Sequence, residues 1–393
     1  GWIISNSDFW NEDAMVDFLK LKASGGVLLT DRNFDYYLYR DAYNANGSYA
    51  YGDPAANYSN IILDVNRIRN YNLGYEKKKS LNVGVQGALL DYALTFDVNA
   101  FVTRYDGQVI KRNSYYPAYL SSFFAYENYN ADRYMGFDAA ISYTKKWGDF
   151  SLTAGLNMLY ARSKVVVRDE VYNNAYQYRK GKPVDAIFGL QNLGFFNNDA
   201  EIASAAEQKF GTVRPGDIHY IDQNSDKVVD EEDEVMIGKS NPDFTGALHL
   251  TFKYKDFSLF IMGEGATGHD IIYNNNYYWV DGNKKYSAEV WNRWTPETAA
   301  TATYPRLSST QNDNNNRTSD FWMRKADYFS LSRVQLNYNF PNTLLRRTFI
   351  RDLSLYLRGS NLLMAAQDVK KRQLNIGSEP QFRYYALGLK VSF

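Results

Sequence analysis

An acidic segment near the middle of the chain has the side chains and the spacing of a calcium-binding loop. Residues 222–233 alternate carboxylate and amide side chains with other residues in the pattern of an EF-hand-type loop. The pattern predicts five side-chain ligands and one main-chain carbonyl ligand, in the order Asp222, Asn224, Asp226, Val228 (carbonyl), Asp230 and Asp233. Because hard oxygen donors at this spacing suit a hard cation, the sequence predicts a structural Ca²⁺ ion here.

One residue of this loop departs from the calcium-binding pattern. Lys227 occupies the sixth position, where glycine is usual because the backbone adopts a positive φ. A residue with a side chain costs about 1 kcal/mol in that conformation. A solvated acidic turn is therefore the alternative interpretation, and the specific spacing of the acceptors favours calcium.

Aromatic residues gather in three polar segments of the chain, at 36–51, 115–126 and 273–279, and the last two supply the candidate surface residues. The first group of candidates is Tyr115, Tyr116 and Tyr119, and the second is Tyr277, Tyr278 and Trp279, which follows three asparagines at 274–276. Aromatic faces beside amides suit sugar rings or peptide backbones, because they combine apolar stacking with directional hydrogen bonds. The sequence thus predicts an outward surface for a substrate or a partner. Packing of these rings within the loops, or on a partner, is the alternative.

The side chains that enzymes use most are scarce. The chain has no cysteine, which excludes disulfides, thiolate metal sites and cysteine nucleophiles. Its three histidines, His219, His249 and His269, stand far apart, and no G-x-S-x-G nucleophile motif occurs. The sequence predicts no catalytic site and no enzyme activity.

Composition narrows the class of protein further. The 393 residues carry 44 Lys and Arg against 44 Asp and Glu, so a nucleic-acid partner is not expected. Aromatic residues make up 16% of the chain. No apolar run reaches the roughly 18 residues of a spanning helix. Gly1 is followed directly by Trp2-Ile3-Ile4, which resembles the end of a strand and predicts that the chain is a fragment.

Strict alternation of apolar and polar residues is the strongest local pattern. In residues 92–104 one face carries Leu94, Phe96 and Val98, and the other carries polar side chains such as Asp97 and Asn99. The same alternation recurs at 135–144, 150–161, 247–261 and 385–393. Several of these segments are ten residues or longer, as a tilted strand needs to cross a bilayer, whereas the strands of soluble sandwiches average about five or six residues.

The connections between these segments alternate in length. Short turns are predicted near 91, 147–149, 255–256 and 348–351, and long polar segments at 113–131, 166–242, 266–318 and 364–380. Short turns at one end and long extracellular loops at the other are typical of a transmembrane antiparallel β-barrel. The predicted fold class is therefore all-β, with the apolar face of each strand against lipid.

Several motifs occur in the order in which a known family has them. They are FLKLKASG at 18–25, NLGYE at 72–76 with LNVGV at 81–85, PGDIHY at 215–220 with IGKSNP at 237–242, LSRVQLNYNFP at 331–341, GSNL at 359–362 and a terminal strand ending on Phe393. Together they resemble the SusC/RagA family of TonB-dependent outer-membrane transporters of Bacteroidetes. The resemblance is collinear and spans nearly the whole chain.

The resemblance implies a domain organisation. Residues 1–393 match the carboxy-terminal portion of a plugged barrel of about 22 strands, and the family's amino-terminal plug and TonB box have no counterpart in this chain. The segment 166–242, with the acidic loop 222–233 inside it, would be a long extracellular loop. The last strand, Tyr385–Phe393, is then expected to pair outside this chain and not with residues 1–30.

The resemblance also implies a function. It is the energised import of oligosaccharides or peptides across the outer membrane, driven through TonB and assisted by a SusD-like surface lipoprotein. Two alternatives stay open from the residues themselves. One is a non-energised outer-membrane barrel used for adhesion or passive diffusion, and the other is a secreted, all-β carbohydrate-binding protein.

Overall fold

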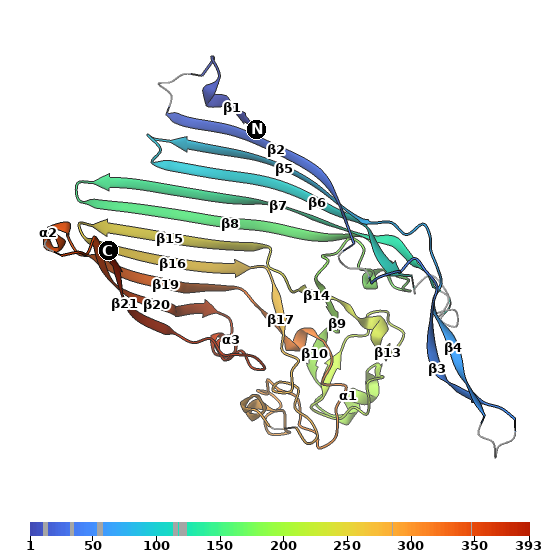
Figure 1. Ribbon diagram of the computed structural model, residues 1–393. Helices are drawn as coiled ribbons and strands as arrows, with labels where there is room; N and C mark the ends of the chain where they lie inside the picture. Colours follow the sequence, from blue (N-terminus) through green and yellow to red (C-terminus); the bar gives the residue numbers. More distant parts are fainter. Residues whose placement is uncertain are drawn as a thin grey trace.

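A large curved antiparallel sheet dominates the computed structural model of the chain (Figure 1). The structure describes residues 1–10, 15–31, 35–52, 58–112, 117, 124–284, 286–346 and 348–393. The sheet has eleven strands in the order β1 (Trp2–Ile3), β2 (Val16–Thr30), β5 (Glu76–Leu89), β6 (Leu94–Lys111), β7 (Tyr126–Trp147), β8 (Phe150–Val167), β15 (Phe244–Tyr254), β16 (Phe257–Thr267), β19 (Tyr328–Asn339), β20 (Asp352–Ala366) and β21 (Tyr384–Ser392). The predicted all-β fold class is confirmed.

Hydrogen-bonded register keeps the apolar side chains of neighbouring strands on one face. Phe96 of β6 pairs with Ile141 of β7, which pairs with Leu156 of β8. On the opposite face, Lys22 Nζ lies 2.6 Å from Asp97 Oδ1, and Asn99 donates to both Asp97 and Asp138 at 3.0 Å. Since side chains alternate along each strand, this register gives the sheet one apolar face and one polar face.

The two ends of the sheet differ in the length of their connections. Short turns join β5 to β6, β7 to β8 and β15 to β16, and a connection containing α2 (Asn342–Leu345) joins β19 to β20. The long connections lie at the other end: 168–243, 268–327, 367–383 with α3 (Val369–Leu374), and 31–75, which carries the hairpin of β3 (Ala42–Ala50) and β4 (Ser59–Arg67). The predicted long connections near 166–242, 266–318 and 364–380 are confirmed, and the connection 31–75 was not predicted. Of the predicted loop 113–131, residues 113–116 and 118–123 lie outside the described residues.

Some predicted boundaries are wrong. Residues 126–131 were expected in a long loop, but they form the first part of β7. These residues continue the strand because their polar side chains form hydrogen bonds to the neighbouring strand β6. For example, Asn128 Nδ2 donates to the carbonyl of Gly107 at 2.8 Å. Tyr92, expected at the start of a strand, lies in the preceding turn with a φ of 60°. The alternation of apolar residues alone therefore misplaces the ends of strands where a strand has a polar end or follows a tight turn.

The two edges of the sheet do not pair with each other among the residues that the structure describes. β21 pairs with β20, and β1 pairs with residues 20–21 of β2 at the opposite edge. In the described part of the chain, β21 has no pairing with residues 1–30. The side chains of Tyr385 and Leu387 are each 72% exposed.

Among the described residues, no helix is both long and apolar enough to cross a membrane.

Two of the long connections fold together into one compact body. This loop module (residues 168–243 and 268–327) contains small two-stranded sheets of β9 (Ala186–Gly189) with β14 (Val235–Lys239), β10 (Asn192–Phe195) with β12 (Ile218–Tyr220), β11 (Glu207–Gln208) with β13 (Val228–Val229), and β17 (Asp270–Ile272) with β18 (Met323–Lys325). It also carries α1 (Asp199–Ser204). Figure 1 shows it at the long-loop end of the sheet.

Candidate functional site at the long-loop end of the sheet

The loop module has a hydrophobic core of its own, built from both connections. The buried side chains are Leu190, Phe210, Ile218, Tyr220, Val229, Tyr273, Tyr278, Val280, Val290, Tyr304 and Trp322. Burial raises the pKa of the Tyr304 hydroxyl to about 12, and this hydroxyl donates to the carbonyl of Tyr278 at 2.7 Å. The two connections therefore form one packed unit, held by tyrosines whose hydroxyls find partners in the interior.

The second predicted aromatic group belongs largely to this core. Tyr278 is 4% exposed and stacks on Tyr273 with ring centroids 4.4 Å apart, and Lys371 of α3 lies 5.5 Å from the Tyr278 ring. Tyr277 and Trp279 are half-buried and pack against the same core. The outward recognition surface predicted for Tyr278 is therefore wrong, because its ring is an interior contact. Tyr115, Tyr116 and Tyr119 lie outside the described residues.

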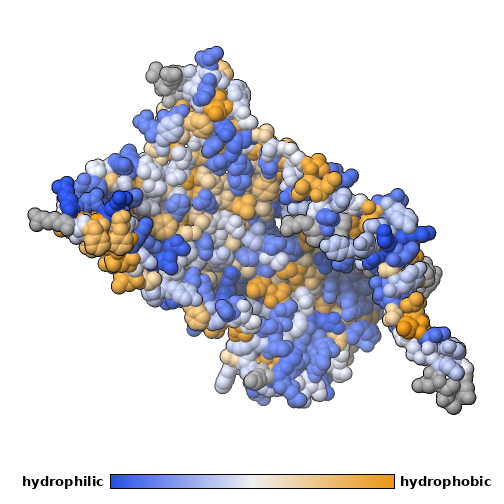
Figure 2. Space-filling model, viewed as in Figure 1, coloured by the Kyte–Doolittle hydropathy of each residue, from blue (hydrophilic) through white to orange (hydrophobic). Residues whose placement is uncertain are grey.

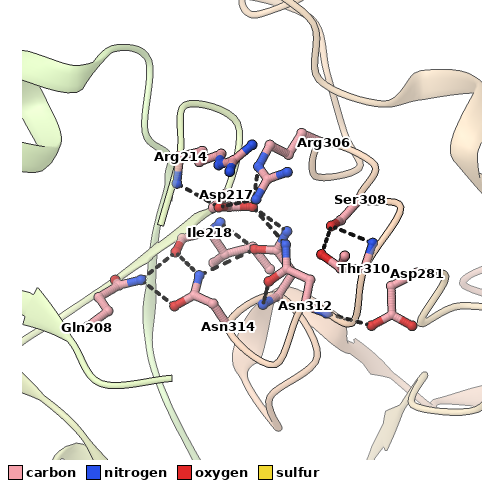
Figure 3. A network of polar contacts seen from close by, with 11 residues as sticks. Gln208, Arg214, Asp217, Ile218, Asp281, Arg306, Ser308, Thr310, Asn312 and Asn314 are labelled. Atoms are coloured by element: carbon pink, nitrogen blue, oxygen red, sulfur yellow. Dashed lines mark hydrogen bonds and ion pairs between the residues drawn. The ribbon is translucent and has the colours of Figure 1, made fainter. Parts of the chain in front are cut away.

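A buried carboxylate joins the two connections of the loop module (Figure 3). Asp217 belongs to the connection 168–243, is fully buried, and has its side-chain partners in the connection 268–327. Arg306 Nη2 donates to Asp217 Oδ2 at 2.9 Å, and Arg306 Nε lies 2.8 Å from Oδ1. Asn312 and Asn315 donate their amides to Oδ1 at 3.0 and 2.8 Å. A buried charge is costly unless it is paired and hydrogen-bonded, and Asp217 is both.

Neighbouring amides extend this network in the same asparagine-rich segment. Asn314 Nδ2 donates to the carbonyl of Ile218 at 3.0 Å, and Gln208 Nε2 donates to Asn314 Oδ1 at 2.6 Å. Gln208 Oε1 in turn accepts from the backbone N–H of Tyr220 at 2.7 Å. Sequence patterns alone did not single out these residues, although asparagines stand close together at 312 and 314–316.

The acidic loop 222–233 folds around its own side-chain oxygens. Asp222 accepts from the backbone N–H groups of Ser225 at 2.7 Å and Lys227 at 2.8 Å. Asp226 Oδ1 accepts from the N–H of Val228 at 2.8 Å, and Asn224 Oδ1 from the N–H of Asp226 at 3.0 Å. Lys227 has a φ of 70°, so the sixth position adopts the conformation that the calcium-loop pattern requires.

The last predicted ligands of this loop have other partners. Asp233 is fully buried and accepts from the N–H groups of Gln223 at 2.7 Å and Asp230 at 2.9 Å, while Asp230 accepts from the N–H of Glu232 at 2.8 Å. In the described residues, no group of three or more histidine or carboxylate side chains converges as a metal site. Burial raises the pKa of the Asp233 carboxyl, because it disfavours the charged form. A cation nearby would favour the charged form. Calcium binding stays a prediction.

The histidines do not assemble with one another. His219, in the loop module, stacks on Phe196 with ring centroids 4.1 Å apart, and burial lowers its pKa. His269 lies at the start of the second connection, with Nδ1 3.8 Å from Asp327 Oδ1, and its pKa is lowered mainly by burial. His249 lies on the polar face of β15, against Gly155. These rings serve packing in this structure.

The chain matches no protein-family model. It does align with curated proteins along its length. It is 23% identical to the TonB-dependent receptor P26 of Formosa agariphila, an alignment that covers 100% of this chain and 41% of the receptor. It is 20% identical to the TonB-dependent receptor SusC of Bacteroides thetaiotaomicron, covering 89% of this chain and 34% of SusC. The chain thus spans between about a third and two fifths of the length of these relatives.

A solved structure shares the fold. A chain of the RagAB peptide importer in its open-open state superposes on 100% of this chain with a TM-score of 0.75 and 19% sequence identity, and 42% of that chain is covered. The chain is similar to SusC/RagA-type TonB-dependent transporters. The predicted family resemblance is confirmed, as is the resemblance of its sheet to the barrels of such transporters. These relatives are named receptors and an importer, which agrees with the prediction that the chain is not an enzyme.

The Asp217 network predicts the effect of removing its charge. In the full-length protein, Asp217→Asn should destabilise the loop module by about 3–5 kcal/mol, because Arg306 stays partly buried without its partner. Amide hydrogen exchange of residues 214–218 and 304–316 should then become faster. The matched control is Glu207→Gln, which breaks an exposed pair with Lys209 and should cost about 0–1 kcal/mol. Equal exchange in both variants would contradict the structural role of Asp217.

The acidic loop predicts a calcium-dependent protection. After removal of calcium by a chelator, adding Ca²⁺ should slow proteolysis and amide exchange at residues 222–233, and Asp226→Ala should abolish that response. Asp313→Ala changes an exposed carboxylate of the loop module outside the acidic loop and should leave the response unchanged. A density map should show Ca–O distances of about 2.3–2.6 Å. Protection that is the same with and without Ca²⁺ would identify a plain acidic turn.

Proposed function

We propose that this chain forms the carboxy-terminal part of the barrel of an outer-membrane importer energised through TonB. One observation carries the proposal: the whole chain superposes on 42% of a RagAB importer chain. The eleven-stranded sheet agrees with it, because among the described residues neither of its outer edges pairs with a further strand. Relatives named TonB-dependent receptors along the same residues support it. In this proposal further strands complete a barrel of about 22 strands, the number typical of plugged outer-membrane transporters.

The two faces of the sheet suit such a barrel. The face that carries Phe96, Ile141 and Leu156 would contact lipid, and the face that carries Asp97 and Asn99 would line the interior. In bacterial barrels the lipid-facing residues form an apolar band, whereas interior residues are polar. The proposed location is therefore the outer membrane, with the long connections outside the cell.

The loop module would stand at the outer mouth of the barrel. Its surface, at the lower centre of Figure 2, is mainly hydrophilic, which suits a domain exposed to water outside the membrane. In that position it could contact a SusD-like surface lipoprotein, the partner that the family resemblance implies. The proposed cargo is an oligosaccharide or a peptide, and the structurally similar RagAB is named a peptide importer.

Passive diffusion and adhesion are the competing functions for the same fold. A passive pore would also have a polar interior, and an adhesin would also have large outer loops. Neither needs an energy source. A secreted carbohydrate-binding protein would need no lipid or detergent, so the full-length protein should stay monodisperse in buffer alone if that alternative holds. Energy dependence and detergent dependence therefore separate the alternatives.

The uptake of labelled cargo tests the proposal. Cells that contain the full-length protein should take up a fluorescently labelled peptide digest or a labelled oligosaccharide mixture, and cells from which its gene is deleted should not. A protonophore should abolish the uptake, because TonB transmits energy from the proton gradient of the inner membrane.

Each other outcome selects another function. Uptake that persists with the protonophore would identify a passive pore. Unchanged uptake after gene deletion, together with weaker attachment of the cells to surfaces, would identify an adhesin. Restoring the gene on a plasmid is the control that assigns either effect to this protein.

A further inference from the structure

A hollow lies on the polar face of the sheet near its long-loop end. Its lining includes Glu76 and Lys78 of β5, Thr103, Tyr105 and Gln108 of β6, and Tyr134 of β7. Its volume is about 690 Å³, within the range of about 300–1,000 Å³ that is common for small-molecule sites. Cross-strand pairing brings these residues together, because Lys78 pairs with Tyr105 and Thr103 pairs with Tyr134.

A β-bulge in β6 aims one of these side chains. Tyr105 pairs with Asp132, but Gln108 pairs with Asn130, so β6 holds one residue more than β7 over this stretch. Without the extra residue, Gln108 and Tyr105 would lie on opposite faces, since side chains alternate along a strand. Gly107, with a φ of 65°, lies in this bulge, and Asn128 Nδ2 donates to its carbonyl at 2.8 Å. Bulges often re-aim side chains at functional sites.

The side chains around the hollow hold one another in place. The rings of Tyr105 and Tyr134 meet edge to face, with centroids 5.7 Å apart and planes at 83°. Lys78 Nζ lies 5.6 Å from the centroid of the Tyr105 ring. Gln108 Nε2 donates to Asp132 Oδ2 at 3.0 Å, and Asp132 is itself fixed by Arg168 at 2.8 Å. A site whose side chains are already ordered loses little entropy when it binds a ligand.

The chemistry of the lining indicates the class of ligand. The main chain of β5, β6 and β7 is engaged in the sheet ladder at the paired residues Lys78, Thr103 and Tyr105, so the hollow presents side chains there. Extended peptides are commonly bound through main-chain hydrogen bonds to a free strand edge, which this wall does not supply. Aromatic rings, a hydroxyl, an amide and an ammonium group instead match a polyhydroxylated ring, with an apolar C–H face and directional hydroxyls.

We propose that this hollow is a contact site for a carbohydrate, an oligosaccharide that passes along the polar face of the sheet. The proposal rests on the proposed import function and names its cargo class. Tyr105 and Tyr134 stack against the C–H faces of sugar rings, and Thr103, Gln108 and Lys78 bind hydroxyls. Glu76 is a positioning residue: it is buried, and its Oε1 accepts the N–H of Val109 at 3.0 Å, next to the bulge.

Binding measurements on the full-length protein in detergent micelles test the proposal. The probes are a panel of defined hexose oligomers, neutral, aminated and carboxylated, and a defined mixture of decapeptides, each measured by isothermal titration calorimetry. At least one oligosaccharide should bind, and Tyr105→Ala should weaken that binding roughly tenfold, because a stacking face is lost. Tyr134→Phe keeps the ring and should retain most of the affinity, whereas Tyr134→Ala should not.

Matched controls and contrary outcomes complete the test. Tyr254→Ala removes an exposed tyrosine at the short-turn end of the sheet and should leave the affinity unchanged. Unaltered thermal unfolding of each variant shows that the fold is intact. If no oligosaccharide of the panel binds, or only peptide binding responds to the tyrosine variants, the carbohydrate assignment is wrong. If oligosaccharides bind equally to all variants, the site is wrong. Either result leaves protonophore-sensitive uptake, the test of the import function, standing on its own.

Discussion

In a sheet that crosses hydrocarbon, every main-chain N–H and C=O group must find its partner within the protein, because lipid tails offer none and each unpaired group costs several kcal/mol. The eleven-stranded sheet of this chain meets that requirement between its strands but leaves the outer edge of β21 and most of that of β2 without partners among the described residues. The proposal of a larger barrel follows from this constraint. Strand addition at these two edges would pair the exposed backbone groups and close the apolar face around the barrel.

The loop module also depends on partners for a buried polar group, in this case a side-chain carboxylate. Two connections that are far apart in the sequence share one core, and the buried carboxylate of Asp217 ties them together through Arg306 and two asparagines. In the proposed importer, this packed body at the strand ends would shape the mouth through which cargo passes. The hollow beside Tyr105 and Tyr134 lies on the polar face below the same end of the sheet.

Much of the sheet could be predicted from the sequence, because alternation in strands is local. Leu94, Phe96 and Val98 share a face in any extended strand, whatever its neighbours are. The core of the loop module could not be predicted in this way. Tyr278 and its neighbours look like surface residues in a polar segment, and only contacts with distant residues such as Trp322 and Tyr304 bury them. The partners of Asp217 and the bulge before Gln108 are likewise set by tertiary contacts.

The acidic loop 222–233 could be predicted in part from the sequence. Its spacing was visible in the sequence, and the structure gives Lys227 the backbone conformation that a calcium loop needs. The sequence could not predict that Asp222 and Asp233 accept hydrogen bonds from backbone N–H groups of the same loop, because these contacts depend on how the loop folds.

The central claim is that this sheet completes a larger barrel, and a structure of the full-length protein in a lipid nanodisc tests it most directly. The decisive observation is the strand that lies along the outer edge of β21. The account predicts main-chain hydrogen bonds from Tyr384–Ser392 to a strand that lies outside residues 1–393. Pairing of β21 with β2 in a closed barrel of the eleven strands seen here would contradict it.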